Sequence, residues 1–164
     1  MPEPFTIREA TPADLATIVT HRRKMFEDMG YDRAILAAAE PHFRRWIKER
    51  LENGRYLGWL AVEPGGKVVA GTGLWLLDWP PGFFDTSPYR GYILNVYTDH
   101  DYRKRGLARQ LVQMAVDWCA AHDIRTVSLH ASSQGKPLYE DLGFAPTNEM
   151  RMMLPEKMLE TTRE

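Results

Sequence analysis

The chain has 164 residues, of which 44% are hydrophobic and 26% charged, a composition typical of one domain with a sizeable core. Its formal net charge of −1 lacks the basic surplus of a nucleic-acid-binding protein, so we expect no nucleic-acid partner. No apolar run reaches the ~18–20 residues of a membrane span, no signal peptide is visible, and a single cysteine excludes an internal disulfide, so we expect a cytoplasmic protein without a membrane partner.

The first third of the chain predicts one strand followed by helices. Residues 5–10 alternate in polarity, as in a short strand. Residues 11–14 are typical of a helix start, because they combine a capping threonine, a proline and an acid, and helical spacing continues to Gly30. A second helix is predicted to begin near Pro41 and to stop at Asn53-Gly54. The Ala-rich residues 31–40 are compatible with a helix too.

Three strands and one long loop are predicted in the middle of the chain. Residues 56–62 and 68–77 have strand patterns, and the Pro-Gly-Gly turn chemistry of residues 63–67 predicts a hairpin between them. Residues 78–91 are rich in proline and aromatic side chains, which favours a loop. The apolar run that follows predicts a strand over 92–98.

The last third predicts alternating helices and strands. Helical spacing of apolar side chains covers residues 107–122, and a strand is predicted over 126–131. A short helix over 137–142 is closed by a glycine, and a final strand is predicted over 149–154.

The order of these elements predicts an α/β fold with a mixed sheet. The strand–helix–strand unit over 92–131 requires a parallel crossover, whereas the hairpins require antiparallel pairs. We expect a single domain over residues 1–164, with a core at about 5–154 and a polar tail at 155–164.

The most informative segment lies at residues 99–109, between a predicted strand and a predicted helix. Three cations, Arg103 to Arg105, follow an acidic turn, and small residues at Gly106 and Ala108 open the helix. The first N–H groups of a helix have no internal partner and lie at the positive end of its dipole, so this turn predicts a phosphate site. A solvated basic helix start is the competing interpretation, but it predicts acids in the first turn.

The spacing Arg103-x-x-Gly106-x-Ala108 resembles the Arg/Gln-x-x-Gly-x-Gly/Ala signature of the GNAT superfamily of N-acyltransferases. The resemblance extends from Ile7 to about Leu154. It implies the GNAT-like acyl-CoA N-acyltransferase fold, a central and mostly antiparallel sheet with one parallel strand pair, flanked by helices. The two parallel strands should splay apart, with the acyl chain entering between them.

The same resemblance implies acetyl-CoA as co-substrate. The backbone at a strand end would hold the pantetheine arm, and the basic turn would hold the pyrophosphate. We expect no metal, because the five histidines show no metal-ligand spacing and no cysteine pair exists. The coenzyme-binding residues that the resemblance implies are Val96, Tyr97, Thr98, Arg103, Lys104, Arg105, Gly106, Leu107, Ala108, Arg109 and Ser132.

A second match, Leu-Tyr-x-x-x-Gly-Phe over residues 138–144, resembles the last GNAT motif. It implies that Tyr139 is the general acid that returns a proton to the leaving thiolate, which a phenol of pKa ~10 facing a thiol of pKa ~8.5 can do. A core aromatic under the sheet is the alternative, and the two roles are compatible. Upstream the chain departs from the motif, because Ser132 replaces the usual Asn and Gly135 the usual Ala.

The sequence does not identify a general base. Many relatives have a Glu near the start of the fourth strand, and Tyr92 occupies that position here. A backbone-held water is one alternative. Four side chains are also candidates for the base, although each has an ordinary structural interpretation as well: His21, Glu27, Asp28 and His130.

The resemblance implies an N-acetyltransferase that moves the acetyl group of acetyl-CoA to a primary amine of a small molecule or peptide, by direct attack in a ternary complex. The first helix, the turn at 29–32 and the loop at 78–85 are the expected walls of the acceptor site. Two alternatives stay open: a non-catalytic acyl-CoA-binding or sensory domain, and a partner-binding domain whose basic turn holds another anion. Relatives are often dimers, so a homodimer is one option.

Overall fold

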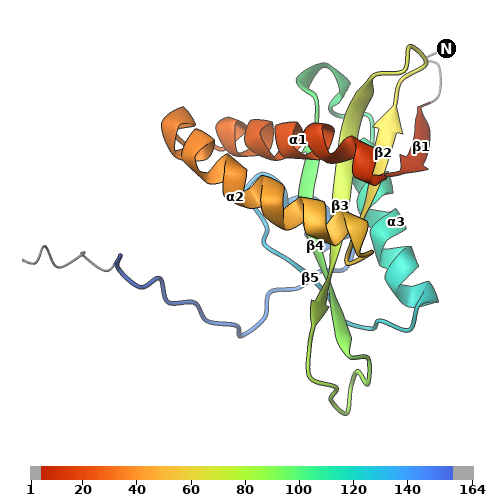
Figure 1. The fold of residues 1–164 in the computed structure, drawn as a ribbon. Coiled ribbons are helices and arrows are strands. Elements are labelled where there is room, and N and C mark those ends of the chain that lie inside the picture. The colour runs from red at the N-terminus through yellow and green to blue at the C-terminus, as the bar shows by residue number, and fades with distance from the viewer. Residues whose placement is uncertain (1–4, 157–164) are drawn as a thin grey trace, which may run out of the picture.

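A mixed sheet forms the centre of the computed structural model, which describes residues 5–156 (Figure 1). Within these residues the sheet has five strands in chain order: β1 (Thr6–Glu9), β2 (Tyr56–Val62), β3 (Val68–Asp78), β4 (Tyr89–Thr98) and β5 (Val127–Leu129). The pairs β1–β2, β2–β3 and β3–β4 are antiparallel, and β4–β5 is parallel. The predicted fold class, a mostly antiparallel sheet with one parallel pair, is confirmed.

Helices cover both faces of this sheet. They are α1 (Leu15–Asp28), α2 (Arg33–Glu52), α3 (Leu107–Ala121) and α4 (Lys136–Asp141), with short 3-10 turns at Pro12–Asp14 and His100–Tyr102. α1 and α2 run across one face, and α3 connects β4 to β5 on the other (Figure 1). No helix in the described part of the chain is both long enough and apolar enough to cross a bilayer.

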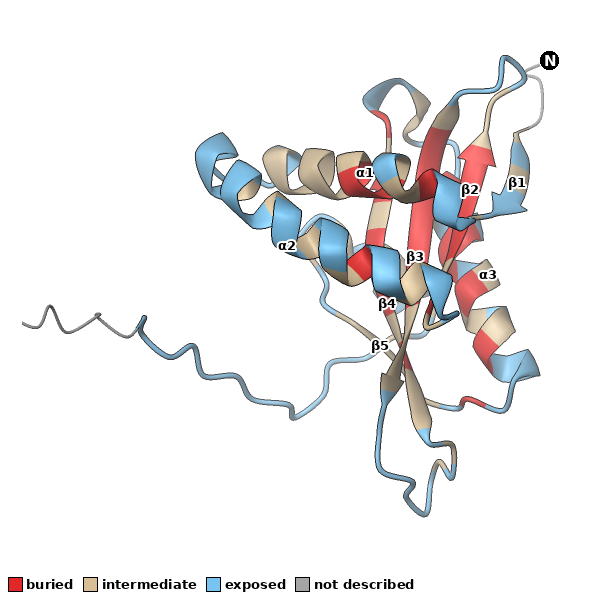
Figure 2. Cartoon of the chain, viewed as in Figure 1, coloured by how far each residue is buried: buried red, intermediate tan, exposed pale blue. Residues whose placement is uncertain are grey.

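Each face has its own apolar core. Side chains three or four positions apart on α3 share one face of the helix and pack onto β2, β3 and β4, with Leu111, Val112, Ala115 and Cys119 fully buried. On the opposite face, a second cluster joins the inner faces of α1 and α2 to β2 (Figure 2). Its buried members are Ile18, Val19, Ile47 and Tyr56. The sheet is therefore buried on both faces where the helices cross it.

α2 is one helix from Arg33 to Glu52, so the predicted helix start at Pro41 was wrong. The start signal is Asp32, whose carboxylate accepts hydrogen bonds from the backbone N–H groups of Ala34 (2.9 Å) and Ile35 (3.2 Å). Pro41 lies inside the helix, where it removes one backbone hydrogen bond. The Ala-rich stretch before the proline favours helix strongly enough for the helix to run through it.

The strand predicted over residues 149–154 is not formed. Residues 149–152 alternate polar and apolar side chains, but a strand also needs a neighbouring edge to pair with. After Phe144 the chain leaves the sheet, and every residue from 145 to 156 is exposed (Figures 1 and 2). β4 also begins earlier than expected, at Tyr89, which shortens the predicted loop. Most of the expected polar tail, residues 157–164, lies outside the described residues.

Candidate active site

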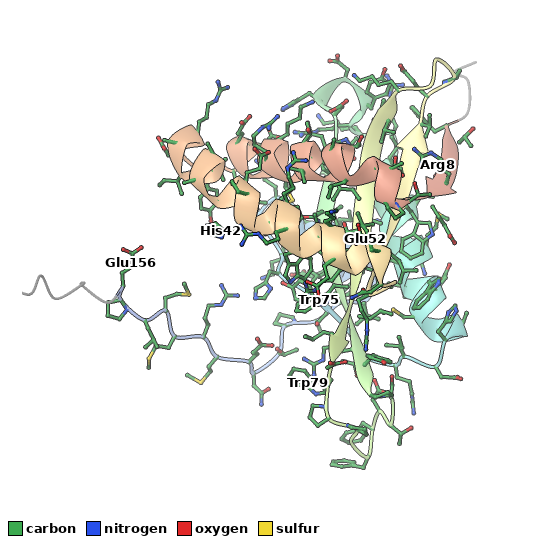
Figure 3. All side chains as sticks on the ribbon, viewed as in Figure 1. Arg8, His42, Glu52, Trp75, Trp79 and Glu156 are labelled. Atoms are coloured by element: carbon green, nitrogen blue, oxygen red, sulfur yellow. The ribbon has the colours of Figure 1, made fainter. Side chains whose placement is uncertain are left out.

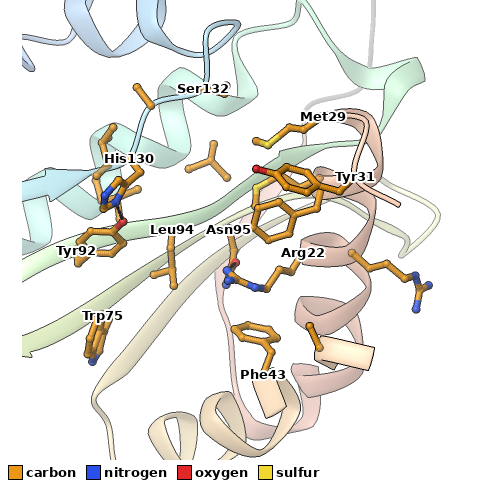
Figure 4. A pocket seen from close by; sticks show the side chains of 18 of the residues that line it. Arg22, Met29, Tyr31, Phe43, Trp75, Tyr92, Leu94, Asn95, His130 and Ser132 are labelled. Carbon is orange, nitrogen blue, oxygen red and sulfur yellow. Dashed lines mark hydrogen bonds between the residues drawn. The ribbon is translucent and has the colours of Figure 1, made fainter. Parts of the chain in front are cut away.

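A cavity of about 1050 Å³ lies between the helices α1 and α2 and the last two strands of the sheet (Figure 4). Its walls are mainly apolar and aromatic. Its polar side chains come from distant parts of the chain. Among them are Arg22, Tyr92, Asn95, His130, Ser132 and Tyr139.

The cavity opens where β4 and β5 stop pairing, after three residue pairs. Their parallel ladder covers only Gly91–Ile93 of β4 and Val127–Leu129 of β5. Beyond it β4 continues to Thr98, whereas the chain after Leu129 turns away. Residues 94–96 and 129–132 then border the cavity from its two sides. The expected splay of the parallel strands is confirmed by this ladder.

A bulge in β4 shapes the middle of the cavity wall. Gly71 of β3 pairs with Tyr97 and Gly73 pairs with Leu94, so β4 carries one extra residue here. Asn95 lies in this bulge with a φ of 57°, in the left-handed region that Asn tolerates better than most residues. Its side chain is buried, donates to the Tyr56 hydroxyl (3.1 Å) and accepts from Arg22 (2.8 Å). Asn95 was not among the site residues predicted from the sequence, although an Asn inside an apolar strand pattern was an available signal.

The basic turn presents an uncapped helix start. Gly106 is the N-cap of α3 with a φ of 79°, and within the described residues no side chain caps this end. The first turn of α3 contains no acid either. The leading N–H groups of α3 therefore remain available to an anion, as predicted from the sequence.

Three of the four cations near this turn are bound to other parts of the chain. The Arg103 side chain donates to the Thr98 carbonyl oxygen (2.8 Å) and to Asp28 at the end of α1 (2.6 Å). Arg105 donates to the carbonyl oxygen of Asp101, and Arg109 forms an ion pair with Asp141 of α4 (2.9 Å). These contacts hold the loop in shape, and the backbone of the turn remains the main feature suited to an anion.

The residues predicted for the pantetheine arm do not all face the cavity. Val96 lines it, but Tyr97 does not: its ring packs against His21 of α1, with ring centroids 5.0 Å apart. Tyr97 can therefore serve a ligand in the cavity only through its backbone.

Ser132 and Tyr139 meet at the far wall of the cavity. The Ser132 hydroxyl accepts a hydrogen bond from the backbone N–H of Gly135 (3.1 Å), and the Tyr139 ring lies directly over that glycine. A methyl group on Gly135 would come within 2.9 Å of the ring and 3.2 Å of the hydroxyl oxygen. Ser132 and Gly135 are thus matched to each other. Burial raises the pKa of Tyr139 above the ordinary 10.0, so its phenol carries a proton at neutral pH.

Of the four candidate bases, His130 alone lines the cavity. Its Nδ1 contacts the Tyr92 hydroxyl and its Nε2 contacts the Arg151 guanidinium. A guanidinium only donates hydrogen bonds, so Nε2 accepts, and Nδ1 carries the proton of a neutral imidazole. Asp28 is instead held by Arg103 and by His100 (3.0 Å) on the other side of α1.

The loop after β3 is not a wall of the cavity, contrary to the sequence prediction. Phe83 and Phe84 are 89% and 79% exposed, and Figure 3 places Trp79 toward the end of the sheet that lies away from α1 and α2. The loop follows the long β3 strand beyond the region that the helices cover. The other two segments expected as walls of the acceptor site do line the cavity, through α1 residues together with Met29 and Tyr31.

A mixed sheet whose parallel strands splay beside an uncapped helix start defines an acyltransferase-like class of fold. Comparison with protein families identifies the particular one: residues 18–144 match the model of the Acetyltransferase (GNAT) family, so the chain belongs to this family. Among the described residues, no group of three or more His, Cys, Asp or Glu side chains is placed to hold a metal ion.

Solved structures agree with this assignment. The chain is 38% identical to a GCN5-related N-acetyltransferase from Ralstonia eutropha, with a TM-score of 0.87 over 92% of this chain and 99% of that one. It is 26% identical to a protein from Clostridium acetobutylicum described as a predicted acetyltransferase and determined with acetyl-CoA, with a TM-score of 0.85 over 92% and 96% of the two chains. Glucosamine-6-phosphate N-acetyltransferase from Arabidopsis thaliana shares the fold at 19% identity and a TM-score of 0.67, over 94% of this chain and 100% of that one. A comparison with curated proteins found no match.

Proposed function

We propose that this protein is an acetyl-CoA-dependent N-acetyltransferase that acts on a primary amine of a small molecule or peptide in a ternary complex. The observation that carries the proposal is the cavity between the splayed strands. Val96, Ser132 and Tyr139, three residues named from the sequence for coenzyme binding or catalysis, line it together. Family membership and the Clostridium acetobutylicum structure with acetyl-CoA support the choice of coenzyme.

The start of α3 would hold the coenzyme diphosphate through its backbone N–H groups, and Lys104 next to it would add positive charge. The backbone of the β4 bulge would face the pantetheine arm. The coenzyme supplies an activated acetyl thioester. The chain's contribution is to align the amine with that thioester and to exclude water from the aromatic cavity, which accounts for much of the rate of such reactions.

Two side chains would move protons in this scheme. His130 accepts the proton of the attacking amine at Nε2, which requires Arg151, on the exposed segment 145–156, to release that nitrogen. The C–N bond forms as the C–S bond breaks, and Tyr139 gives its proton to the departing sulfur. Tyr92, which occupies the position of the usual Glu, holds the His130 tautomer through Nδ1.

The first test is acetyl transfer to a panel of amines, measured as thiol release, with amino acids, polyamines, aminoglycosides and peptides. Acetyl-CoA-dependent thiol release that requires an amine supports the enzyme. Calorimetric binding of acetyl-CoA with no turnover on any amine would favour the non-catalytic acyl-CoA-binding domain, which the Tyr92 and Ser132 replacements make the second candidate.

Replacing Tyr139 by Phe tests the proposed acid. We expect kcat to fall by about 10²-fold or more, because the departing thiolate loses its proton donor, while KM for acetyl-CoA stays nearly unchanged. Tyr89→Phe is the matched control, since Tyr89 is a partly buried tyrosine outside the cavity. An unchanged kcat across pH in Tyr139→Phe would remove Tyr139 from the mechanism.

A further inference from the structure

We propose that the acceptor amine also carries a negatively charged group, a carboxylate or a phosphate, and that this group pairs with Arg22 inside the cavity. The inference rests on the proposed function and names the class of its substrate. Arg22 comes from the middle of α1 and projects toward β4 between Phe43 and Asn95 (Figure 4).

The Arg22 guanidinium is held in place without being neutralised. It lies over two aromatic rings, 4.3 Å from the centroid of Phe43 and 4.9 Å from that of Phe26. One of its nitrogens, Nη1, donates to the amide oxygen of Asn95 (2.8 Å). A guanidinium has five N–H donors in a fixed plane, so most of them remain for a further acceptor. The contact with Asn95 and the stacking fix the direction in which those donors point.

The charged side chains that line the cavity are three arginines and two glutamates, so they sum to one positive charge. Arg23 forms an ion pair with Glu40 (3.0 Å), and Arg151 contacts His130. Arg22 forms no ion pair with any carboxylate among residues 5–156. Arg22 is therefore a positive charge without a carboxylate partner, held at a defined place in the cavity.

An uncompensated cation in this setting favours an anionic ligand. Burial lowers the pKa of Arg22, which reflects the loss of water around the charge, yet the guanidinium stays charged at neutral pH. A planar guanidinium binds carboxylate and phosphate through two parallel hydrogen bonds. The coenzyme phosphates are assigned to the start of α3, and residues 103–109 do not line this cavity. The anion that meets Arg22 therefore belongs to the acceptor.

The remaining lining of the cavity indicates the chemistry of the acceptor beyond its anionic group. The rings of Phe26, Tyr31, Trp46 and Trp75 and the side chains of Met25 and Met29 line the same space. An amine with an apolar or aromatic body and one anionic group matches this lining. A polycation such as a polyamine does not, because it would meet the Arg22 charge.

The experiment compares acceptors that differ only in the anion. Phenylalanine is measured against phenethylamine, β-alanine against propylamine, and phosphoethanolamine against ethanolamine, with kcat/KM for each. In the wild type we expect the anionic member of at least one pair to be preferred by about tenfold or more, which is the usual effect of a hydrogen-bonded charge pair. The first two pairs report on carboxylate and the third on phosphate.

Arg22→Met tests the residue itself. Methionine keeps an apolar stem between the two rings but removes the charge, so the preference should fall to near one, mainly through KM of the anionic acceptor. Arg22→Lys should restore part of it. Arg45→Met is the control, because Arg45 is an exposed arginine on α2 that does not line the cavity.

Two results overturn the proposal: equal kcat/KM within every pair of the wild type, or a preference that Arg22→Met leaves unchanged. If no amine is acetylated, the proposed function fails, and the same question is then asked by calorimetry with the coenzyme A complex. N-acetylphenylalanine must bind at least about tenfold more tightly than N-acetylphenethylamine, or N-acetylphosphoethanolamine than N-acetylethanolamine, and Arg22→Met must abolish the difference. Equal binding there also overturns the proposal.

Discussion

His21 is a buried histidine of α1 whose ring packs on Tyr97 of β4, outside the lining of the cavity. Burial lowers its pKa from 6.5 to about 4. The unfolded chain therefore binds a proton between pH 6.5 and 4 that the folded chain does not. The stability contributed by neutral His21 is complete above about pH 6.5 and is lost as the pH falls towards 4.

We expect the free energy of unfolding, measured in urea between pH 7 and pH 4, to fall less steeply in His21→Gln than in the wild type. His42→Gln, which changes an exposed histidine on α2, should leave the pH dependence unaltered. A His21 imidazole that titrates near pH 6.5 by NMR would contradict the expectation.

Some residues of the candidate site could be predicted from the sequence and others could not. Ser132 and Tyr139 were predicted, because both belong to a sequence motif whose residues lie close together along the chain. Arg22 and Asn95 were not, because their roles depend on a bulge in β4 that brings two residues 73 positions apart within hydrogen-bond distance. Such a contact leaves no local pattern in a single sequence.

The spacing between β4 and α3 depends on Gly91. A methyl group built on Gly91 would lie 2.7 Å from Sγ of Cys119 and 3.2 Å from a methyl carbon of Leu74, and both neighbours are fully buried. We expect Gly91→Ala to cost about 1–3 kcal/mol of unfolding free energy through overpacking, measured by denaturant titration.

Two variants make this expectation specific. Gly65→Ala, in the β2–β3 turn, meets its nearest atom at 3.6 Å and should cost far less. Adding Cys119→Ala to Gly91→Ala should recover part of the loss, since it removes the closest obstacle. Equal costs at Gly65 and Gly91 would show that the contact with Cys119 does not limit the packing.

The errors in the predicted elements have one common cause. The internal proline of α2, Pro41, was taken as the helix start, whereas the helix begins at the capping side chain of Asp32, nine residues earlier. Residues 149–154 have a strand pattern but no neighbouring edge in the described structure. Periodicity reports which residues an element would bury, but pairing and capping partners decide whether it forms.

For the molecule as a whole, coenzyme binding should appear as stability. A ligand that binds only the folded chain adds about 2.7 kcal/mol at a concentration 100 times its Kd, which corresponds to a rise in Tm of about 5–10 °C for a chain of this length. We expect acetyl-CoA to raise the Tm in a thermal melt, and pantetheine, which lacks the diphosphate, to raise it much less. A larger shift with ATP than with acetyl-CoA would indicate that the basic turn serves another anion.

Cys119 is the single cysteine of the chain and is fully buried between α3 and the sheet. Burial raises the pKa of its thiol to about 11, so at the pH of an ordinary assay it is both inaccessible and protonated. A chromogenic disulfide reagent added to the native protein should consequently react with almost no protein thiol. Any sulfhydryl signal in such a mixture would then count coenzyme A alone, which allows turnover to be followed continuously at high protein concentration.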